Sequence, residues 1–443
     1  GKVGIGTTTP SSLLHIHTVG SGTATTIITE DDARKIFIGR DSIKCTDLSN
    51  NVANLNIQQD GGQSTFGGTV TGTSFNGIAF YSGDTGSIYT HNVSGTDDSA
   101  TYNTAYGLAA LDAIQTGDRN TAIGYNAAGA LTSGIENVII GTDAGDAITT
   151  SSYNVAVGTY ALSTEDSHGK NVAIGHSTLA TFNANAHGHN VAVGFESGKL
   201  MTTGIQNTLI GAHAGDGLQE GGDNVAIGFH ALSTEDANGQ NVAIGAQALQ
   251  NQNAGANAYN VAIGFQSGLN VTTGVQNTIM GGLAGDALTT GSFNVAMGYN
   301  SLSATTVGAL NTAIGNFALS SNILTNGNVA IGQQALQVAV GDGSTNNQLT
   351  YNTAVGYFAG KAITTGTLNT LVGALAGDAI TTGLSNTALG VKALSSDTTG
   401  RFNVAIGLGT LENQNFTGNN EVYNTAVGYS AGNDITTGTN NTL

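Results

Sequence analysis

The sequence predicts an all-β fold, a parallel β-solenoid whose coils are about 17 residues long. A five-residue phrase that begins with Asn recurs through most of the chain, and fifteen of its nineteen intervals are equal, as from Asn120 to Asn137 and on to Asn154. Apolar residues within the phrase alternate as they do in strands. A regular repeat of this kind is typical of solenoids, in which each repeat packs only on its neighbours.

Composition excludes several other classes of protein. The 443 residues include 66 Gly and one Pro, 39% are hydrophobic and only 9% are charged. Disordered chains carry more charge and fewer apolar residues, so we expect an ordered chain. The formal net charge is −18 with only 11 Lys and Arg, which argues against a nucleic-acid partner and against an anionic membrane surface. The single cysteine, Cys45, excludes a disulfide framework.

The repeated phrase reads Asn, then Thr or Val, a small or apolar residue, usually Ile or Val, and Gly. Its twenty copies begin at Asn103 and end at Asn441. The fifth residue is Gly in every complete copy, from Gly107 to Gly428, and the eighth is always Ala, Ser or Thr. Space should therefore be tight at both positions.

Each repeat is predicted to contain two strands separated by two corners. In the phrase that starts at Asn171, Val172 and Ile174 share one strand face and are expected to point into the core. Ala173 and the Gly are expected on the other face, where a second backbone can approach. The second strand is expected at segments such as Tyr160-Ala161-Leu162. Twenty stacked coils would extend roughly 95 Å at one strand spacing per coil.

Asparagines at one corner are expected to form a ladder of amide hydrogen bonds along the stack, as Asn does in other stacked β structures. The predicted ladder residues are Asn120, Asn137, Asn154, Asn171, Asn190, Asn207, Asn224, Asn241, Asn260 and Asn277. The glycines predicted to be tightly packed are Gly124, Gly141, Gly158, Gly175, Gly194, Gly211, Gly228, Gly245, Gly264 and Gly281.

A longer period, four coils in length, overlies the first. Repeats with an Ala-Gly-Asp phrase begin at Asn137, Asn207 and Asn277, and each has Ile or Leu where most repeats have Ala. Four coils therefore make one larger unit, which recurs at Asn369 after one additional coil near Asn328.

Three regions are expected along the chain. Residues 1–20 would form an entry segment, residues 21–102 a β-rich shaft or cap, and residues 103–443 the solenoid. Alternating polar and apolar residues predict strands in the second region, and these cover Thr23–Thr29, Lys35–Gly39, Val52–Gln58 and Ser64–Phe75. Because the chain starts at Gly1 and stops at Leu443 within a repeat, we expect it to be a piece of a longer polypeptide.

The phrases at residues 171–175 and 241–245, Asn-Val-Ala-Ile-Gly, resemble the head repeats of trimeric autotransporter adhesins of the YadA type and those of many phage tail-fibre proteins. The resemblance covers the chain from Asn103 to the end, although the repeat is longer than is usual in that family. It implies a left-handed parallel β-roll assembled as an intertwined homotrimer.

The same resemblance implies a structural and adhesive role in an extracellular fibre that attaches to a host or surface. A cell-surface receptor or glycan and other fibre or virion proteins would be its partners, without membrane insertion by this segment. The opening phrase at residues 1–10, followed by Leu14-His15-Ile16-His17, resembles a linker of phage tail fibres, which favours a virion over a bacterial surface. No catalytic residue, metal or cofactor is expected; the alternative is a polysaccharide-degrading tailspike.

Histidines and aspartates are the candidate ligand residues. His187 and His189 precede Asn190 in a widened repeat and would bind a metal if three copies converged, but an exposed polar loop is the expected state. His176, His213 and His230 follow the Gly corner and are expected at the surface. The Ala-Gly-Asp aspartates are expected to cap turns rather than hold calcium, because one Asp per coil supplies too few oxygens. They are Asp146, Asp216, Asp286 and Asp378.

Two acidic pairs raise the question of catalysis. Glu165-Asp166 and Glu235-Asp236 lie one four-coil unit apart in matching Ser-Thr-Glu-Asp loops. Paired carboxylates are typical of glycoside hydrolysis, but a duplicated solvated turn is the expected state. Threonine pairs occupy too few consecutive coils for an ice-binding array; examples are Thr202-Thr203, Thr272-Thr273 and Thr381-Thr382.

Overall fold

The computed structural model describes residues 30–31, 34–38, 43–47, 74–75, 78–79, 88–90, 99–237, 239–341, 348–418 and 420–443. The chain divides into two compact units, Gly1–Gly72 and Thr73–Leu443. In the first, β1 (Glu30–Asp31), β2 (Arg34–Ile38) and β3 (Ile43–Asp47) form an antiparallel sheet. Strand β2 covers most of the strand predicted at Lys35–Gly39. Those predicted at Thr23–Thr29 and Val52–Gln58, and most of Ser64–Phe75, lie outside the described residues.

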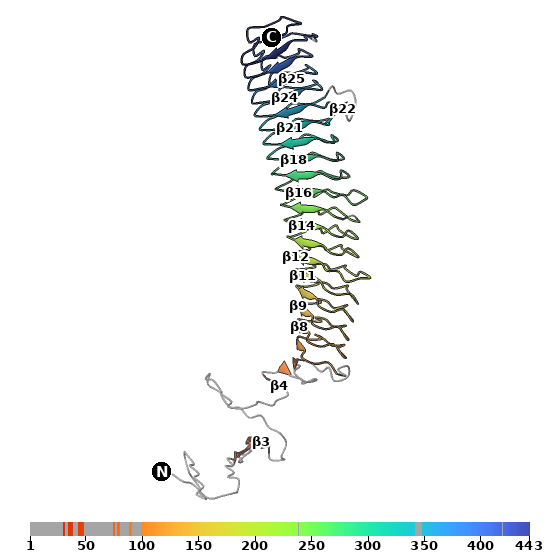
Figure 1. Ribbon diagram of the computed structural model, residues 1–443. Helices are drawn as coiled ribbons and strands as arrows, with labels where there is room; N and C mark the ends of the chain where they lie inside the picture. The colour runs from red at the N-terminus through yellow and green to blue at the C-terminus, as the bar shows by residue number, and fades with distance from the viewer. Residues whose placement is uncertain are drawn as a thin grey trace, which may run out of the picture. The chain divides into compact units, whose positions relative to one another are not determined.

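The second unit begins with a short antiparallel pair, β4 (Ser74–Phe75) and β5 (Ile78–Ala79), and continues as a column of stacked coils (Figure 1). Twenty parallel strands, one per coil, form a single ladder that runs from β6 to β27. Their bounds are β6 Ile88–Tyr89, β7 Thr104–Tyr106, β8 Thr121–Ile123, β9 Val138–Ile140, β10 Val155–Val157, β11 Val172–Ile174, β12 Val191–Val193, β13 Thr208–Ile210, β14 Val225–Ile227, β15 Val242–Ile244, β16 Val261–Ile263, β17 Thr278–Met280, β18 Val295–Met297, β19 Thr312–Ile314, β21 Val329–Ile331, β23 Thr353–Val355, β24 Thr370–Val372, β25 Thr387–Leu389, β26 Val404–Ile406 and β27 Thr425–Val427. The predicted all-β parallel solenoid is therefore confirmed. Nineteen copies of the phrase form the ladder strands from β7 to β27, whereas β6 precedes the first copy and the last copy, at Asn441, forms only an isolated bridge to Thr425 through Thr442.

Register in the ladder is fixed by the phrase itself. Each residue of a strand pairs with the same position of the next coil; Val225, Ala226 and Ile227 of β14, for example, lie opposite residues 242, 243 and 244 of β15. Backbone hydrogen bonds join the coils, and one runs from the N–H of Gly245 to the carbonyl of Ile227 at 2.7 Å. Parallel pairing of identical positions puts like side chains in continuous rows along the column.

The strand faces are reversed from the sequence prediction. Ala173 at the centre of β11 is fully buried, whereas Ile174 is 38% exposed. The same pattern recurs along the ladder, where the central residue of each three-residue strand points into the coil. The reason is the thinness of the coil: the opposite wall lies so close that the strand centre usually accommodates only Ala, and the branched residues are left outside.

The predicted second strand is also absent in the described coils, each of which carries one main strand and a run of turns. Tyr160 and Leu162 have φ of +58° and +53°, in the left-handed region. A strand requires φ near −120°, so these residues cannot continue a β ladder. The left-handed residues curl the chain inward instead, and they place Ala161 and Leu162 in the core.

Core packing follows the four-coil period. In the coil that starts at Asn207, the strand centre is Leu209, and a Cβ placed on Gly215 of the opposite wall would lie 2.8 Å from it and 2.9 Å from Leu218. In the next coil the strand centre is Ala226 and the opposite wall carries Leu232, both fully buried. A large residue on one wall is thus balanced by Gly on the other, which keeps the interior filled at constant coil size.

The longest repeat contains an additional short strand outside the main ladder. The repeat from Asn328 to Asn352 adds β22 (Gln348–Leu349), which pairs in parallel with β20 (Thr325–Asn326) outside the main ladder. The main ladder continues without interruption from β21 to β23 across this insertion.

Glycine is required at the fifth position of the phrase because consecutive coils of the chain approach each other closely there. Gly281 has φ of +133°, and a Cβ on it would lie 2.6 Å from the carbonyl oxygen of Gly298 in the next coil. The ten predicted glycines all have φ between 133° and 142°. The second backbone that approaches is therefore that of the next coil of the same chain.

We expect Gly281→Ala to destabilise the column by about 3 kcal/mol or more, because the new Cβ meets backbone atoms and the residue keeps a strained φ. Its neighbour Gly282 provides the control, since a Cβ there would have only Tyr299 within 4 Å, at 3.7 Å. Gly282→Ala should change stability by less than about 1 kcal/mol. Denaturant unfolding of both variants makes the comparison, and equal stability would contradict the stacking argument.

Candidate functional site

The ladder asparagines form a continuous chain of hydrogen bonds inside the column. The Oδ1 of each accepts the backbone N–H of the next, over nineteen steps from Asn103 to Asn441 at 2.8 to 3.3 Å. The ten asparagines singled out from the sequence are all at most 1% exposed. Asn294, in the same ladder, also donates from Nδ2 to Asn277 Oδ1 at 3.1 Å and to the Gly308 carbonyl at 2.9 Å. Each amide thus satisfies backbone groups that the corner would otherwise leave unpaired.

The outer face of the ladder is an apolar strip. The first and third residues of the strands from β7 to β27 are Thr, Val, Ile, Leu, Met or Tyr, and none is charged. These side chains are half-exposed or exposed; Val138 and Ile331, for example, are each 37% exposed. An uncharged face that extends through so many coils is larger than the isolated apolar patches of ordinary monomers.

A second row of side chains lies at the corner that follows the Gly. His176 stacks on Phe195 with ring centroids 5.3 Å apart, and His213 stacks on His230 at 4.7 Å. His213 Nδ1 lies 3.2 Å from Asp216 Oδ2. The three histidines predicted at the surface are half-exposed or exposed. They belong to a ladder of rings that extends over several coils.

The four Ala-Gly-Asp aspartates share one environment. In each, Oδ1 is buried without a hydrogen-bond partner. Burial is the main cause that raises the pKa of each carboxyl, and the nearby backbone N–H groups partly offset it at Asp146 and Asp286. The four residues are separated along the column by whole four-coil units or more, so each acts alone.

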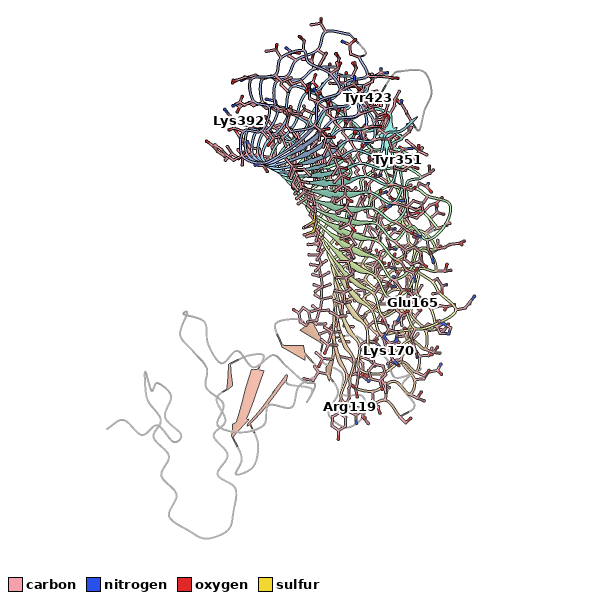
Figure 2. All side chains as sticks on the ribbon, turned by 45° about the horizontal axis from the view of Figure 1, so that its top comes forward. Arg119, Glu165, Lys170, Tyr351, Lys392 and Tyr423 are labelled. Carbon is pink, nitrogen blue, oxygen red and sulfur yellow. The ribbon has the colours of Figure 1, made fainter. Side chains whose placement is uncertain are left out.

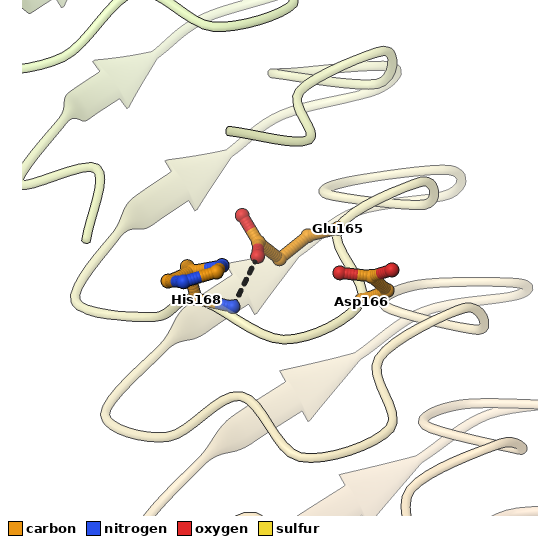
Figure 3. Close-up of side chains that lie close together, drawn as sticks. All are labelled: Glu165, Asp166 and His168. Carbon is orange, nitrogen blue, oxygen red and sulfur yellow. Dashed lines mark hydrogen bonds between the residues drawn. The ribbon is translucent and has the colours of Figure 1, made fainter. Parts of the chain in front are cut away.

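The loop at residues 165–168 contains the group of acidic and histidine side chains drawn in Figure 3. Donor atoms of Glu165, Asp166 and His168 all lie within 4.8 Å of one another. Glu165 Oε1 accepts the His168 backbone N–H at 2.7 Å. Figure 2 places Glu165 and Lys170 on one edge of the column and Lys392 on the other.

The acidic pairs are not the solvated turns that the sequence suggested. Glu165 and Glu235 are fully buried, and only Asp166 and Asp236 reach the outside of the loops. Burial raises the pKa of Glu165 to about 7, since removal from water disfavours the charged form. Both glutamates occupy the core position that Leu218 fills in the coil before Glu235, so they are part of the interior of the coil.

His187 and His189 lie in the loop of the next coil, beside His168. The ring centroids of His168 and His187 are 6.2 Å apart, and those of His187 and His189 are 6.1 Å apart. Desolvation and the positive charges of Lys170, His168 and His189 lower the pKa of His187. His168 was not among the candidates from sequence; its offset of one repeat from His187 was the available signal.

The threonine pairs also form hydrogen bonds between consecutive coils. The hydroxyls of Thr202, Thr272 and Thr381 donate to carbonyl oxygens of the next coil at 2.9 to 3.2 Å. These hydroxyls are thus engaged with the protein itself.

Within the described parts of the chain, no helix has the length and apolar character needed to cross a membrane. No family model, curated protein or solved structure matches the chain.

Asn294→Ala should destabilise the protein by about 3 kcal/mol, because the Asn311 N–H and the Gly308 carbonyl would lose their buried partner. The exposed Asn316 provides the control, and Asn316→Ala is expected to cost less than about 1 kcal/mol. Denaturant unfolding measures both. A similar small loss for the two variants would show that the ladder contributes little.

Asp286→Asn should stabilise the protein at pH 7 and leave it unchanged at pH 3. Since burial raises the pKa of Asp286 in the folded state, the folded protein binds the proton more tightly than the unfolded chain, and the wild type loses stability as the pH rises above the ordinary carboxyl pKa. Thermal unfolding of both proteins between pH 3 and 8 tests this. A stability difference that does not vary with pH would contradict it.

Proposed function

We propose that this chain is a structural and adhesive part of an extracellular fibre, assembled as a homotrimer of left-handed coils. The apolar strip on the outer face of the ladder is the observation that carries the proposal. A strip of this length in water favours association, because burial of apolar surface is the main driving force for protein contacts.

A second and third copy of the same chain are the partners that suit the strip best. Its side chains repeat at one strand spacing, about 4.8 Å, through the ladder from β7 to β27. A partner must present a complementary surface with the same spacing over the same length. An identical column meets this requirement in every coil, and closed rotational symmetry then limits the assembly to a few copies.

Adhesion is assigned to the loops and exposed rings, since the interior of the coils is occupied by stacking contacts. Aromatic residues directly before the ladder asparagines, among them Tyr153, Tyr259 and Tyr351, are about half exposed. Their rings combine an apolar face with a polar hydroxyl, which suits contacts with a cell-surface receptor or glycan. The resemblance of the first residues to phage tail-fibre linkers favours a virion fibre, with other virion proteins as partners, over a bacterial surface adhesin.

The alternative function, cleavage of polysaccharide, is less well supported. Glycoside hydrolysis needs two carboxyl groups that both reach the sugar. Glu165 and Glu235 are fully buried, so the acidic pairs do not offer such an arrangement. Incubation of the purified protein with capsular or cell-wall glycans, followed by an assay for new reducing ends, separates the two functions; new ends would favour the enzyme.

Replacement of Ile227 on the outer face by Lys should break the homotrimer without unfolding the coil. The side chain is half-exposed, so the charge is tolerated in one column but is expensive to bury between columns. Sedimentation equilibrium should give three chains for the wild type and fewer for Ile227→Lys. Asn253→Lys, at an exposed loop position, should remain trimeric. A monomeric wild type would overturn the proposed assembly.

A further inference from the structure

Three histidines from two consecutive coils gather at one loop edge of the column. His168 comes from the coil that starts at Asn154, whereas His187 and His189 come from the next coil. Neighbouring rings have centroids 6.1 and 6.2 Å apart and are steeply inclined, at 82° and 70°. We propose that these imidazoles form a binding site for one divalent transition-metal ion of the zinc class, which joins the loops of the two coils.

Hydrogen bonds prepare His168 for this role. Ser167 Oγ lies 2.7 Å from Asp166 Oδ1 and 3.1 Å from His168 Nδ1. The single hydroxyl proton must go to the carboxylate, which only accepts, so the hydroxyl oxygen accepts the proton of Nδ1. His168 is then the tautomer with a free lone pair on Nε2. Metal-binding histidines commonly have their second nitrogen held in this way.

The carboxylate of Asp166 contributes negative charge beside the rings. Asp166 and Glu165 each offer a carboxylate oxygen within 4.8 Å of a ring nitrogen of His168. Lys170 acts in the opposite direction, because its positive charge lowers the pKa of His187. The exposed carboxylate of Asp166 thus offsets the ammonium of Lys170 beside the three rings.

The geometry selects the kind of ion. Zinc binds imidazole nitrogen at about 2.0 to 2.1 Å, which places the rings of two ligands roughly 5 Å apart. The separations of His187 from His168 and from His189 each exceed this by about 1 Å, so rotation of the loop side chains must bring the three rings onto one ion. Calcium and magnesium prefer oxygen ligands, so three imidazoles exclude them as the matching ions.

A matching loop that lacks the three histidines lies one four-coil unit further along the chain, and it provides a control. This loop keeps Glu235 and Asp236, but it carries Asn257 and Tyr259 at the positions of His187 and His189, and Asn238 at that of His168. The same coil length therefore accommodates either set of residues, so exchange between the two loops should leave the fold intact.

Zinc titration of the full chain at pH 7.5, in competition with a chromophoric chelator, tests the site. We expect one Zn²⁺ per chain for the wild type, and at least about a 100-fold weaker affinity for the double variant His187→Asn and His189→Tyr. Ser167→Ala should weaken binding about tenfold through the loss of the bond that orients His168. Thermal unfolding in a chelator should be the same for all three proteins.

A gain of binding provides the converse test. The triple variant Asn238→His, Asn257→His and Tyr259→His should bind a second Zn²⁺ per chain. The proposal is overturned if the wild type binds no Zn²⁺, if the double variant retains wild-type affinity, or if the triple variant still binds one ion. Each result is independent of the oligomeric state and of adhesion, because it depends only on residues of one chain.

Discussion

The close stacking of one coil on the next is the constraint on which the rest of this structure depends. At the Gly corner the backbones approach until no Cβ fits between them, as the contact between Gly281 and the Gly298 carbonyl demonstrates. That approach allows the Asn ladder to bridge every interface with hydrogen bonds of normal length. It also makes the coil thin, so that the centre of each strand admits Ala, or a larger residue only where the opposite wall has Gly.

A thin coil changes the use of its apolar residues. In a broad sheet protein the branched residues of a strand fill the core, but here the Val and Ile side chains at the first and third strand positions remain on the outside, and the core consists mainly of Ala and Leu with some Ile. The outer strip and the loops then divide the surface between them. The outer strip is uncharged and regular, which suits association. The loops carry the charged and aromatic groups, which vary from coil to coil.

Sequence reasoning identified the period, the parallel stack, the ladder asparagines and the glycines, because each of these repeats in every coil. It failed where a choice depended on the width of the coil: the orientation of Val172 and Ile174, the second strand at Tyr160, and the burial of Glu165. Alternation with period two cannot distinguish an inner from an outer face, and left-handed φ values at Tyr or Leu leave no mark in composition. His168 was missed because its partners come from another coil.

Hydrogen bonds between the coils point along the column, and the strands lie across it. Tension applied to the two ends of such a column therefore pulls directly on these bonds, coil by coil in series, while the covalent chain carries little load until a coil opens. An opened coil releases about 17 residues, roughly 55 Å of extended chain, in place of about 4.8 Å of stacked rise. A column built in this way lengthens by whole coils under a steady pull, and it dissipates a sudden load well before any covalent bond is stressed.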